Sequence, residues 1–377
     1  MMKKSRRITK SALLFCFAMA SPAQTLTVLF SFSGSDGYQP VAPLIQGIDG
    51  NLYGTTSLGG GAGNGTLFRI TPGGTLSTLH NFCSSAKCAD GSRPVAGLVQ
   101  AADGNLYGTT QYGGVNIALG DGTVFRITPG GTLTTLYKFC SLANCADGAY
   151  PAAGLVRGRD GNFYGTTANT VFKMTPQGDL STLYAFTDPL AVWPLGLVQG
   201  RDGNFYGTTI MGGKYHAGTV FVITPRGKLA TLHNFRNTDG WKPEGGLVQG
   251  ADGGFYGTTY FGGGKNYGTV FKITPHGMLT TLYSFCAEST CIDGVLPEAG
   301  LVEGGDGMFY GTTSGAGAHD HGTVFRITPD GTLTTLYAFD VYNGDGPQAA
   351  LLKAADGRLY GTTALGGSAG FSEACGA

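Results

Sequence analysis

Short stretches in which apolar and polar residues alternate recur along the whole chain. In segment 123–128, Phe125 and Ile127 fall on one face of an extended strand. The residues beside them, Val124 and Arg126, fall on the other face. β-branched and aromatic residues dominate such stretches, and no 3.6-residue or heptad period competes with them. The pattern therefore predicts an all-β protein built from short strands.

These stretches belong to a repeat that organises the sequence. The tetrapeptide Tyr-Gly-Thr-Thr occurs seven times, beginning at Tyr53, Tyr107, Tyr164, Tyr206, Tyr256, Tyr310 and Tyr360. The mean spacing is about 51 residues, a period typical of propellers and arrays. An Asp-Gly pair precedes each copy at the same offset, and its glycine supplies the positive φ that a short hairpin turn requires. Each repeat is therefore one compact β unit.

One unit consists of four expected strands. In the second unit, strand a lies at 97–100, strand b at 105–110, strand c at 123–128 and strand d at 133–139. Short turns separate a from b and c from d. The absence of helical periodicity excludes helical solenoids and leaves radial blades or a linear β-array.

The two ends of the repeat region favour a closed ring. A strand of type d at 25–32 precedes the first strand a, and strands a and b of a seventh unit lie at 350–363. An N-terminal strand that completes the last blade removes exposed sheet edges, whereas a linear array gains nothing from this permutation. We predict a seven-bladed β-propeller. Strand c occurs six times, so the seventh would have to come from the glycine-rich tail 364–377, where we expect weak closure.

The first 23 residues have the composition of an export leader. Basic residues come first, the apolar run 12–20 follows, and small residues surround Ala23. The run is too short to span a bilayer as a helix. We expect a signal peptide at 1–23, one propeller domain at 24–363 and a tail at 364–377. The mature chain would be secreted, periplasmic or extracellular, with cell-surface association as a further option.

Removing this leader changes the charge balance. Its five charged residues are all basic, so 24 minus 5 leaves 19 basic residues against 24 acidic ones, a net charge near −5. This balance argues against a nucleic-acid partner. Glycine accounts for 66 of 377 residues and charged residues for only 13%, as expected of many tight turns and few solvated helices.

Six cysteines form three local pairs, each after a strand d. The pairs are Cys83 with Cys88, Cys140 with Cys145, and Cys286 with Cys291. Each pair accompanies a four-residue insertion, which favours a disulfide that staples the longer loop in an oxidising compartment. The alternative is zinc, which would require further Cys or His ligands nearby, and none recurs. Cys375 in the tail is left without a partner.

The loops at the two ends of the strands differ in variability. Because neighbouring strands are antiparallel, the uniform a–b and c–d turns share one face, and the varied b–c and d–a loops share the other. We call the second face the variable loop face, and loops on a rigid scaffold often carry function. Unconstrained drift would explain the variation equally well. Its candidate ligand-binding residues are Trp193, Lys214, Tyr215, His216, Trp241, Tyr260, Phe261, Lys265, Tyr267, His319, Asp320 and His321.

Acidic residues and histidines do not point to a catalytic or metal site. Thirteen of the 24 acidic residues stand in repeated Asp-Gly pairs, which are ordinary turn chemistry, whereas calcium needs six to eight converging oxygens. His319, Asp320 and His321 could share a metal, but a solvated loop is the better interpretation. We therefore predict no catalytic residue, metal or cofactor. An enzyme should instead show non-repeating acids or histidines that converge at the central channel.

Two segments carry a family resemblance. Segment 196–209, Gly-Leu-Val-Gln-Gly-Arg-Asp-Gly-Asn-Phe-Tyr-Gly-Thr-Thr, and the Gly-Thr-Val-Phe-Val-Ile-Thr-Pro of 218–225 resemble the GloVer tandem-repeat family. Its members are exported bacterial proteins called "choice-of-anchor" because they end in different surface-sorting signals. The resemblance covers essentially the whole expected mature chain. It implies export and surface association but no established activity, so no catalytic residue is carried over.

This chain departs from the family pattern in lacking a C-terminal sorting helix or basic tail, which argues against anchoring and is consistent with a truncated gene product. The favoured function is a non-enzymatic binding or scaffold module that presents its variable loop face to an extracellular glycan or protein. The alternatives are a propeller-type polysaccharide hydrolase or lyase and a purely structural surface-array protein. The array protein would lack a concave, aromatic-lined pocket on that face.

Overall fold

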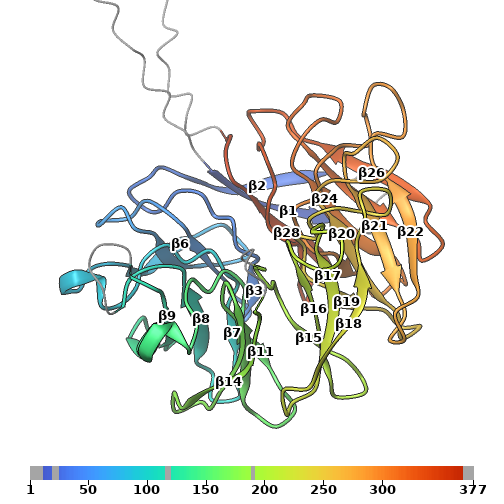
Figure 1. Cartoon of the computed structure of the whole chain (residues 1–377). Coiled ribbons are helices and arrows are strands. Elements are labelled where there is room, and N and C mark those ends of the chain that lie inside the picture. The colour runs from blue at the N-terminus through green and yellow to red at the C-terminus, as the bar shows by residue number, and fades with distance from the viewer. Residues whose placement is uncertain (1–11, 19–24, 115–119, 188–191, 368–377) are drawn as a thin grey trace, which may run out of the picture.

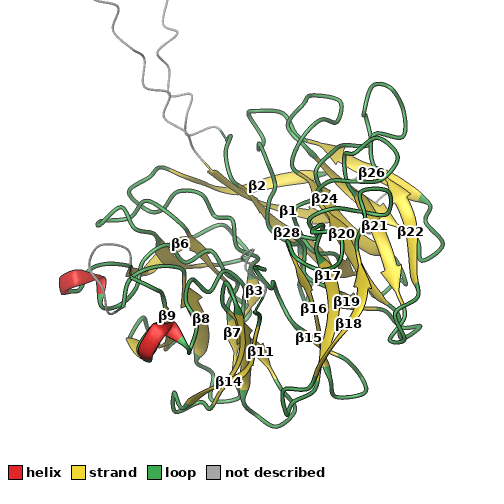
Figure 2. Cartoon of the chain, in the orientation of Figure 1, coloured by secondary structure: helices red, strands yellow, loops and turns green. Residues whose placement is uncertain are grey.

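The structure is a computed structural model that describes residues 12–18, 25–114, 120–187 and 192–367. Within these residues, 28 strands form seven four-stranded antiparallel sheets. The sheets stand around a common axis as the blades of a propeller (Figure 1). Two short 3-10 turns, η1 (Ala86–Cys88) and η2 (Ala143–Cys145), are the helical elements among the described residues (Figure 2). The predicted seven-bladed propeller is confirmed.

Six blades use four consecutive strands each, in the order a, b, c, d. Blade 1 comprises β3 (Ile45–Gln46), β4 (Leu52–Thr56), β5 (Thr66–Ile70) and β6 (Leu76–Asn81). Blade 2 comprises β7 (Val99–Gln100), β8 (Leu106–Thr110), β9 (Thr123–Ile127) and β10 (Leu133–Lys138). Blade 3 comprises β11 (Val156–Arg157), β12 (Phe163–Thr166), β13 (Thr170–Met174) and β14 (Leu180–Ala185).

The remaining three consecutive blades follow the same plan. Blade 4 comprises β15 (Val198–Gln199), β16 (Phe205–Thr209), β17 (Thr219–Ile223) and β18 (Leu229–Asn234). Blade 5 comprises β19 (Val248–Gln249), β20 (Phe255–Thr259), β21 (Thr269–Ile273) and β22 (Leu279–Ser284). Blade 6 comprises β23 (Val302–Glu303), β24 (Phe309–Thr313), β25 (Thr323–Ile327) and β26 (Leu333–Ala338).

Blade 7 joins the two ends of the chain. Its sheet has the order β2 (Leu26–Phe32), β1 (Ala12–Ala18), β28 (Arg358–Thr363) and β27 (Leu352–Lys353), so the N-terminal segment closes the ring as expected. The third position, however, is occupied by β1 and not by residues 364–377. β1 fits because it is apolar and places Phe15 opposite Gly361, where blade 6 places Phe325 opposite Gly311. Residues 364–367 contain no strand, and residues 368–377 lie outside the described residues.

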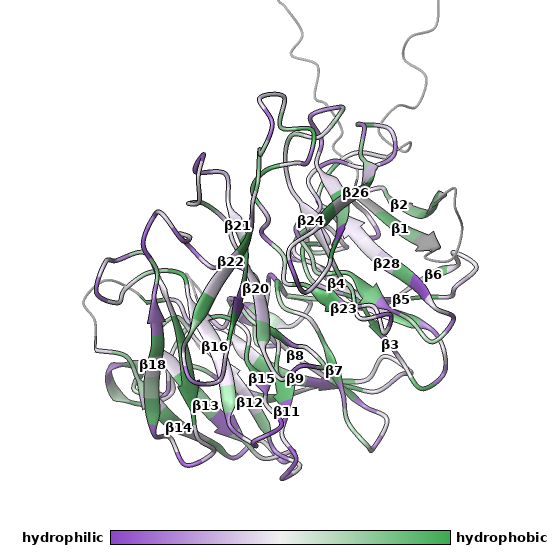
Figure 3. Cartoon of the chain, turned by 90° about the vertical axis from the view of Figure 1, so that its right-hand side faces the viewer, coloured by the Kyte–Doolittle hydropathy of each residue, from purple (hydrophilic) through white to green (hydrophobic). Residues whose placement is uncertain are grey.

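The core lies between neighbouring blades. The tyrosine of each b strand is buried, and Tyr206 and Tyr256 stack on Phe255 and Phe309 of the following blade with ring centroids 4.0 Å apart. Their hydroxyls donate to the aspartate four residues earlier, as in the 2.9 Å bond from Tyr206 to Asp202. Hydrophobic residues run along the strands and hydrophilic ones mark many of the turns (Figure 3). Apolar packing and satisfied polar groups thus fix each blade against the next.

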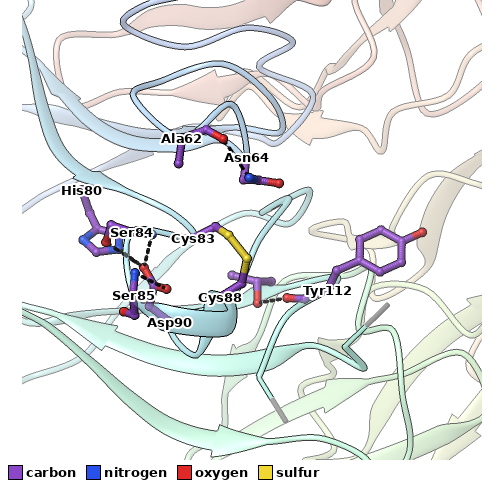
Figure 4. Close-up of a disulfide and its surroundings, with 10 residues drawn as sticks. Ala62, Asn64, His80, Cys83, Ser84, Ser85, Cys88, Asp90 and Tyr112 are labelled. Carbon is purple, nitrogen blue, oxygen red and sulfur yellow. Dashed lines mark hydrogen bonds and ion pairs between the residues drawn. A yellow bond between two sulfur atoms is a disulfide. The ribbon is translucent and has the colours of Figure 1, made fainter. Parts of the chain in front are cut away.

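All three predicted disulfides are present: Cys83–Cys88, Cys140–Cys145 and Cys286–Cys291. Each closes a loop around a buried aspartate. In the first loop the carboxylate of Asp90 accepts hydrogen bonds from Ser84 and Ser85 and contacts His80 at 3.0 Å (Figure 4). These aspartates therefore hold the loops together. Among the described residues, no helix has the length and apolarity needed to cross a bilayer.

Candidate functional site

The segments that lead into the a strands of all seven blades surround one cavity of about 410 Å³ on the propeller axis. Most of the lining residues are Ala, Gly, Val and Leu. Three polar side chains stand among them: Glu244 from blade 5, Glu298 from blade 6 and Gln348 from blade 7. Each belongs to a d–a connection and therefore to the variable loop face. We call this cavity the channel mouth.

Close backbone contact brings the two glutamates together. A Cβ atom on Gly300 would lie only 2.7 Å from the carbonyl oxygen of Gly246, so these glycines allow blades 5 and 6 to approach at the channel. Glu244 and Glu298 stand two residues before Gly246 and Gly300 respectively. The matching offsets place the two glutamates at the same position of adjacent blades, and both line the cavity.

Both carboxyl groups are harder to ionise than usual. Burial, followed by repulsion from Glu298, raises the pKa of Glu244 to about 7, although Lys242 acts in the opposite direction. Burial also raises the pKa of Glu298, and polar contacts with Ser314 and Gln348 oppose that shift. The channel mouth can therefore hold a proton near neutral pH and accept hydrogen bonds from a ligand.

An aromatic row leads outward from these acids. Burial, followed by the charges of Glu298 and Glu244, raises the pKa of Tyr260. The ring of Tyr260 meets Phe261 edge-on at 4.3 Å, and Phe261 lies 5.3 Å from the ring of Trp241. The three rings thus form one row on the variable loop face, with Trp241 at one end and Tyr260 at the other.

Trp241 also lines a second cavity, of about 350 Å³, at the outer end of this row. The other lining residues are Tyr215, His216, Ala217, Asn237 and Asn266, and we call this cavity the rim pocket. The guanidinium of Arg236 lies 4.4 Å from the ring centroid of Tyr215, and Lys214 Nζ lies 5.4 Å from it. The rim pocket therefore combines aromatic faces, side-chain amides and flanking cations.

The structure brings together five of the twelve candidate residues: Tyr215, His216, Trp241, Tyr260 and Phe261. Lys214 flanks them through Tyr215. Concave, aromatic-lined space on the variable loop face is the feature that a purely structural array protein was expected to lack.

The other candidates are placed differently. Lys265 donates to the carbonyl of Ala287 at 3.1 Å, and His321 Nδ1 lies 3.0 Å from the carboxylate of Asp345. Trp193 is half-buried with a positive φ of 46° in the d–a connection before blade 4. Tyr267, His319 and Asp320 are exposed on b–c loops. His321 is thus paired with an aspartate of the connection into blade 7, while His319 and Asp320 face solvent.

Sequence reasoning missed Glu244 and Glu298, although the repeat contains a signal for them. The residue that follows the proline of each d–a connection is apolar in the first four blades, at Val41, Val95, Ala152 and Leu195. It becomes Glu244, Glu298 and Gln348 in the last three blades. Aligning the repeats would have shown a run of polar residues at an inward position. These are non-repeating acids at the central channel, the arrangement expected of an enzyme.

The described residues contain one group of three possible metal ligands, Asp121, Cys140 and Cys145. Its two cysteines are bonded to each other, so their sulfur atoms are not free thiolates. None of these three residues lines the channel mouth.

Comparison with known proteins identifies a repeat family and a fold. The Gloeobacter/Verrucomicrobia repeat matches residues 11–170 and 167–374. No curated protein matches the chain. Among solved structures, a streptogramin B lyase is 18% identical over 96% of this chain and all of its own, with a TM-score of 0.61.

Two further structures have the same fold. A catalytically inactive virginiamycin B lyase from Staphylococcus aureus, solved with quinupristin, is 16% identical over 93% of this chain and 99% of its own, with a TM-score of 0.61. A periplasmic gluconolactonase from Pseudomonas aeruginosa is 18% identical over 87% of this chain and 95% of its own, with a TM-score of 0.53. At these identities the likeness shows the propeller fold alone.

Proposed function

The chain belongs to the Gloeobacter/Verrucomicrobia repeat family, and we propose that it is an exported binding protein for a carbohydrate chain. The ligand would lie across the rim pocket and reach the channel mouth. The observation that carries this proposal is the row of rings Trp241, Phe261 and Tyr260, with the charges of Glu298 and Glu244 acting on Tyr260.

The chemistry along this path suits a sugar. Aromatic faces such as that of Trp241 offer apolar area to the C–H surface of a sugar ring, and few rotatable bonds must be ordered on binding. Carboxylates and side-chain amides accept or donate hydrogen bonds to hydroxyl groups. Ligand sites commonly combine a mainly apolar cavity of a few hundred cubic ångströms with a few convergent polar groups, and the channel mouth, at about 410 Å³, has this form.

Location outside the cytoplasm is supported by the three disulfides. Disulfides persist in oxidising compartments and are rare in reducing ones. The apolar run 12–20 with its preceding basic residues is consistent with an export leader. Export would place the variable loop face among extracellular polysaccharides.

A polysaccharide lyase or hydrolase is the second candidate. The observation that favours it is the pair Glu244 and Glu298, because a carboxyl group with a pKa of about 7 is suited to general acid–base catalysis near neutral pH. In that case Glu244 would move the proton, and the aromatic row would position the chain. The lyase and gluconolactonase relatives demonstrate that propellers of this shape can be enzymes, as their names state.

A glycan array with the purified exported chain, followed by calorimetry on the best ligand, tests the proposal. We expect Trp241→Ala to weaken binding at least about tenfold, since a buried aromatic anchor dominates such interfaces. Tyr342→Ala, which changes an exposed aromatic residue on the same face in blade 6, serves as the matched control and should bind normally. Failure to bind any glycan, or equal binding by both variants, would refute a carbohydrate site here. Ligand turnover that Glu244→Gln abolishes would establish the enzyme instead.

A further inference from the structure

Blade 7 obtains its third strand from a segment that also has the composition of an export leader. β1 lies between β28 and β2, with Phe15 opposite Gly361 and Cys16 opposite Tyr360. Phe15 fills the expected aromatic position, because a Cβ on Gly361 would lie 2.7 Å from Phe15 Cζ, much as a Cβ on Gly311 would lie 2.6 Å from Phe325 Cζ in blade 6. The blade is therefore shaped for a strand of the c type.

β1 does not supply the polar groups that a c strand supplies elsewhere. In each of the other six blades, two threonine hydroxyls, one from the b–c region and one from the c strand, form a hydrogen bond of 2.7–2.9 Å. In blade 6 this pair is Thr313 and Thr323. In blade 7, Thr363 stands opposite Leu13, a residue that has no hydroxyl group. One buried polar pairing of the repeat is therefore missing.

A positive charge is missing as well. In five of the six other blades, an Arg or Lys of strand c stands opposite the buried tyrosine of strand b: Arg69, Arg126, Lys173, Lys272 and Arg326. Two of these cations reach the turn aspartate bound by that tyrosine, with Lys173 at 2.8 Å from Asp160. Blade 7 places the buried thiol Cys16 there, and Arg358 Nε is 3.9 Å from Asp356. Asp356 thus lacks the close strand-c cation that Asp160 has.

We propose that β1 occupies this position only until the leader is removed, and that the vacated slot then accepts a strand from a second polypeptide. The incoming strand would carry Thr, Phe, Arg or Lys, and Ile in the spacing Thr-Val-Phe-Arg-Ile. Its threonine would pair with Thr363 and its cation with Asp356. This inference rests on the export part of the proposed function and is independent of carbohydrate binding.

An empty slot would favour the binding of such a strand. Without β1, the facing edges of β2 and β28 would present unpaired N–H and C=O groups, and Phe339 would lose the ring of Phe15, 5.1 Å away, keeping its edge contact with Tyr337. Strand addition satisfies an open edge through main-chain hydrogen bonds, and side-chain pockets select the sequence. The chain's own c strands are each paired on both sides, and the tail 364–377 contains no Arg, Lys or Thr. The c strands of the described blades are thus all in use, and a strand of the same pattern carried by a second polypeptide fits the slot.

Expression of the full chain in a bacterial host that exports it tests the inference in two steps. First, the intact mass of the exported protein shows whether residues 12–18 have been removed. Second, a labelled peptide with the sequence of residues 122–129, Gly-Thr-Val-Phe-Arg-Ile-Thr-Pro, is titrated into that protein. We expect cleavage, and then one peptide bound per chain with a rise in melting temperature. A cleaved chain that is unfolded alone and folds with the peptide would support the inference equally.

Matched variants identify the slot. Replacing the peptide's Phe125 by Ala should weaken binding at least about a hundredfold, since a buried aromatic ring is lost. Thr363→Val should weaken binding of this peptide, whereas Thr313→Val, whose partner lies within the chain, should not. Retention of residues 12–18, a cleaved chain that ignores the peptide, or equal effects of the two threonine variants would overturn the inference. A negative glycan array would leave these outcomes unchanged, so the two proposals fail separately.

Discussion

Replacing Glu244 by glutamine should stabilise the folded protein above neutral pH. The carboxyl group has an ordinary pKa of 4.5, and burial together with Glu298 raises it to about 7 in the fold. A group whose pKa is raised on folding binds its proton more tightly in the folded state. Its favourable contribution to stability is therefore complete below pH 4.5 and is lost as the pH rises through 7. Glutamine cannot ionise and avoids that loss.

The size of the effect follows from the shift. A rise of about 2.5 pKa units at about 1.36 kcal/mol each gives about 3 kcal/mol. Partial exposure of the side chain at the channel mouth reduces this, so we expect about 2–3 kcal/mol at pH 8 and almost no difference at pH 4. For a chain of this size, 1 kcal/mol corresponds to roughly 1–2 °C in melting temperature. The variant should therefore melt about 3–5 °C higher than the parent at pH 8.

Urea denaturation and thermal melts at pH 4, 6 and 8 measure this difference directly. Glu288→Gln is the matched control, because Glu288 is an exposed glutamate on the loop after β22 and should show no comparable gain. A Glu244→Gln variant that is less stable than the parent at pH 8, or whose gain does not change with pH, would refute the account of the buried carboxyl pair.

Two further predictions concern the blades themselves. Gly257→Ala should destabilise the fold by about 1–3 kcal/mol in urea denaturation, because its Cβ would lie 2.7 Å from Phe271 Cζ and 2.9 Å from Leu247 Cδ2; a neutral result would contradict the tight packing. Asp147→Asn should lower the free energy of unfolding by about 1–3 kcal/mol at pH 7, since the buried carboxylate accepts hydrogen bonds from Tyr137 and Ser141. Burial alone would raise the pKa of Asp147, but its hydrogen bonds, above all the one from the Ser141 backbone, hold that pKa below its usual value. A lowered pKa gives stability that is present above the ordinary pKa and lost as the pH falls, so melts of the variant and parent should converge in acid, and a constant gap would argue against this role.

The blade plan could be predicted from the sequence because each repeat contains the residues that form its own strands and turns. The Asp-Gly turn, the buried tyrosine bonded to its aspartate and the short apolar strands all act within about 20 residues, as in the pair Asp202 and Tyr206. Repetition then confirmed each feature seven times. The disulfides could be predicted equally well, because each pair, such as Cys83 and Cys88, closes a local loop. Ring closure followed from the order of strand types at the two ends of the chain.

The origin of the last strand could not be predicted in the same way. Segment 12–18 is apolar and short, and those properties suit both a leader and a buried strand. Its place in the fold depends on the gap between β2 and β28, which are far apart in the sequence, so no local sequence pattern predicts it. Phe15 matches that gap, whereas Leu13 and Cys16 do not supply the hydroxyl and the cation of the other blades.

The acid pair at the channel mouth is informative because its ionisation lowers the stability of the fold. Glu244 and Glu298 stand 54 residues apart, so no local motif pairs them, and only an alignment of the repeats would have shown that they occupy the same position of adjacent blades. Val41 and Val95 show that an apolar residue fills the same position in other blades. A carboxyl group with a raised pKa weakens the fold at neutral pH where valine would not. A purely structural ring would have no use for two such residues on adjacent blades, beside an aromatic row that leads to the surface. If Glu244→Gln both stabilises the protein and lowers its affinity for a carbohydrate, ligand binding, and not the stability of the propeller, explains why the two glutamates are present.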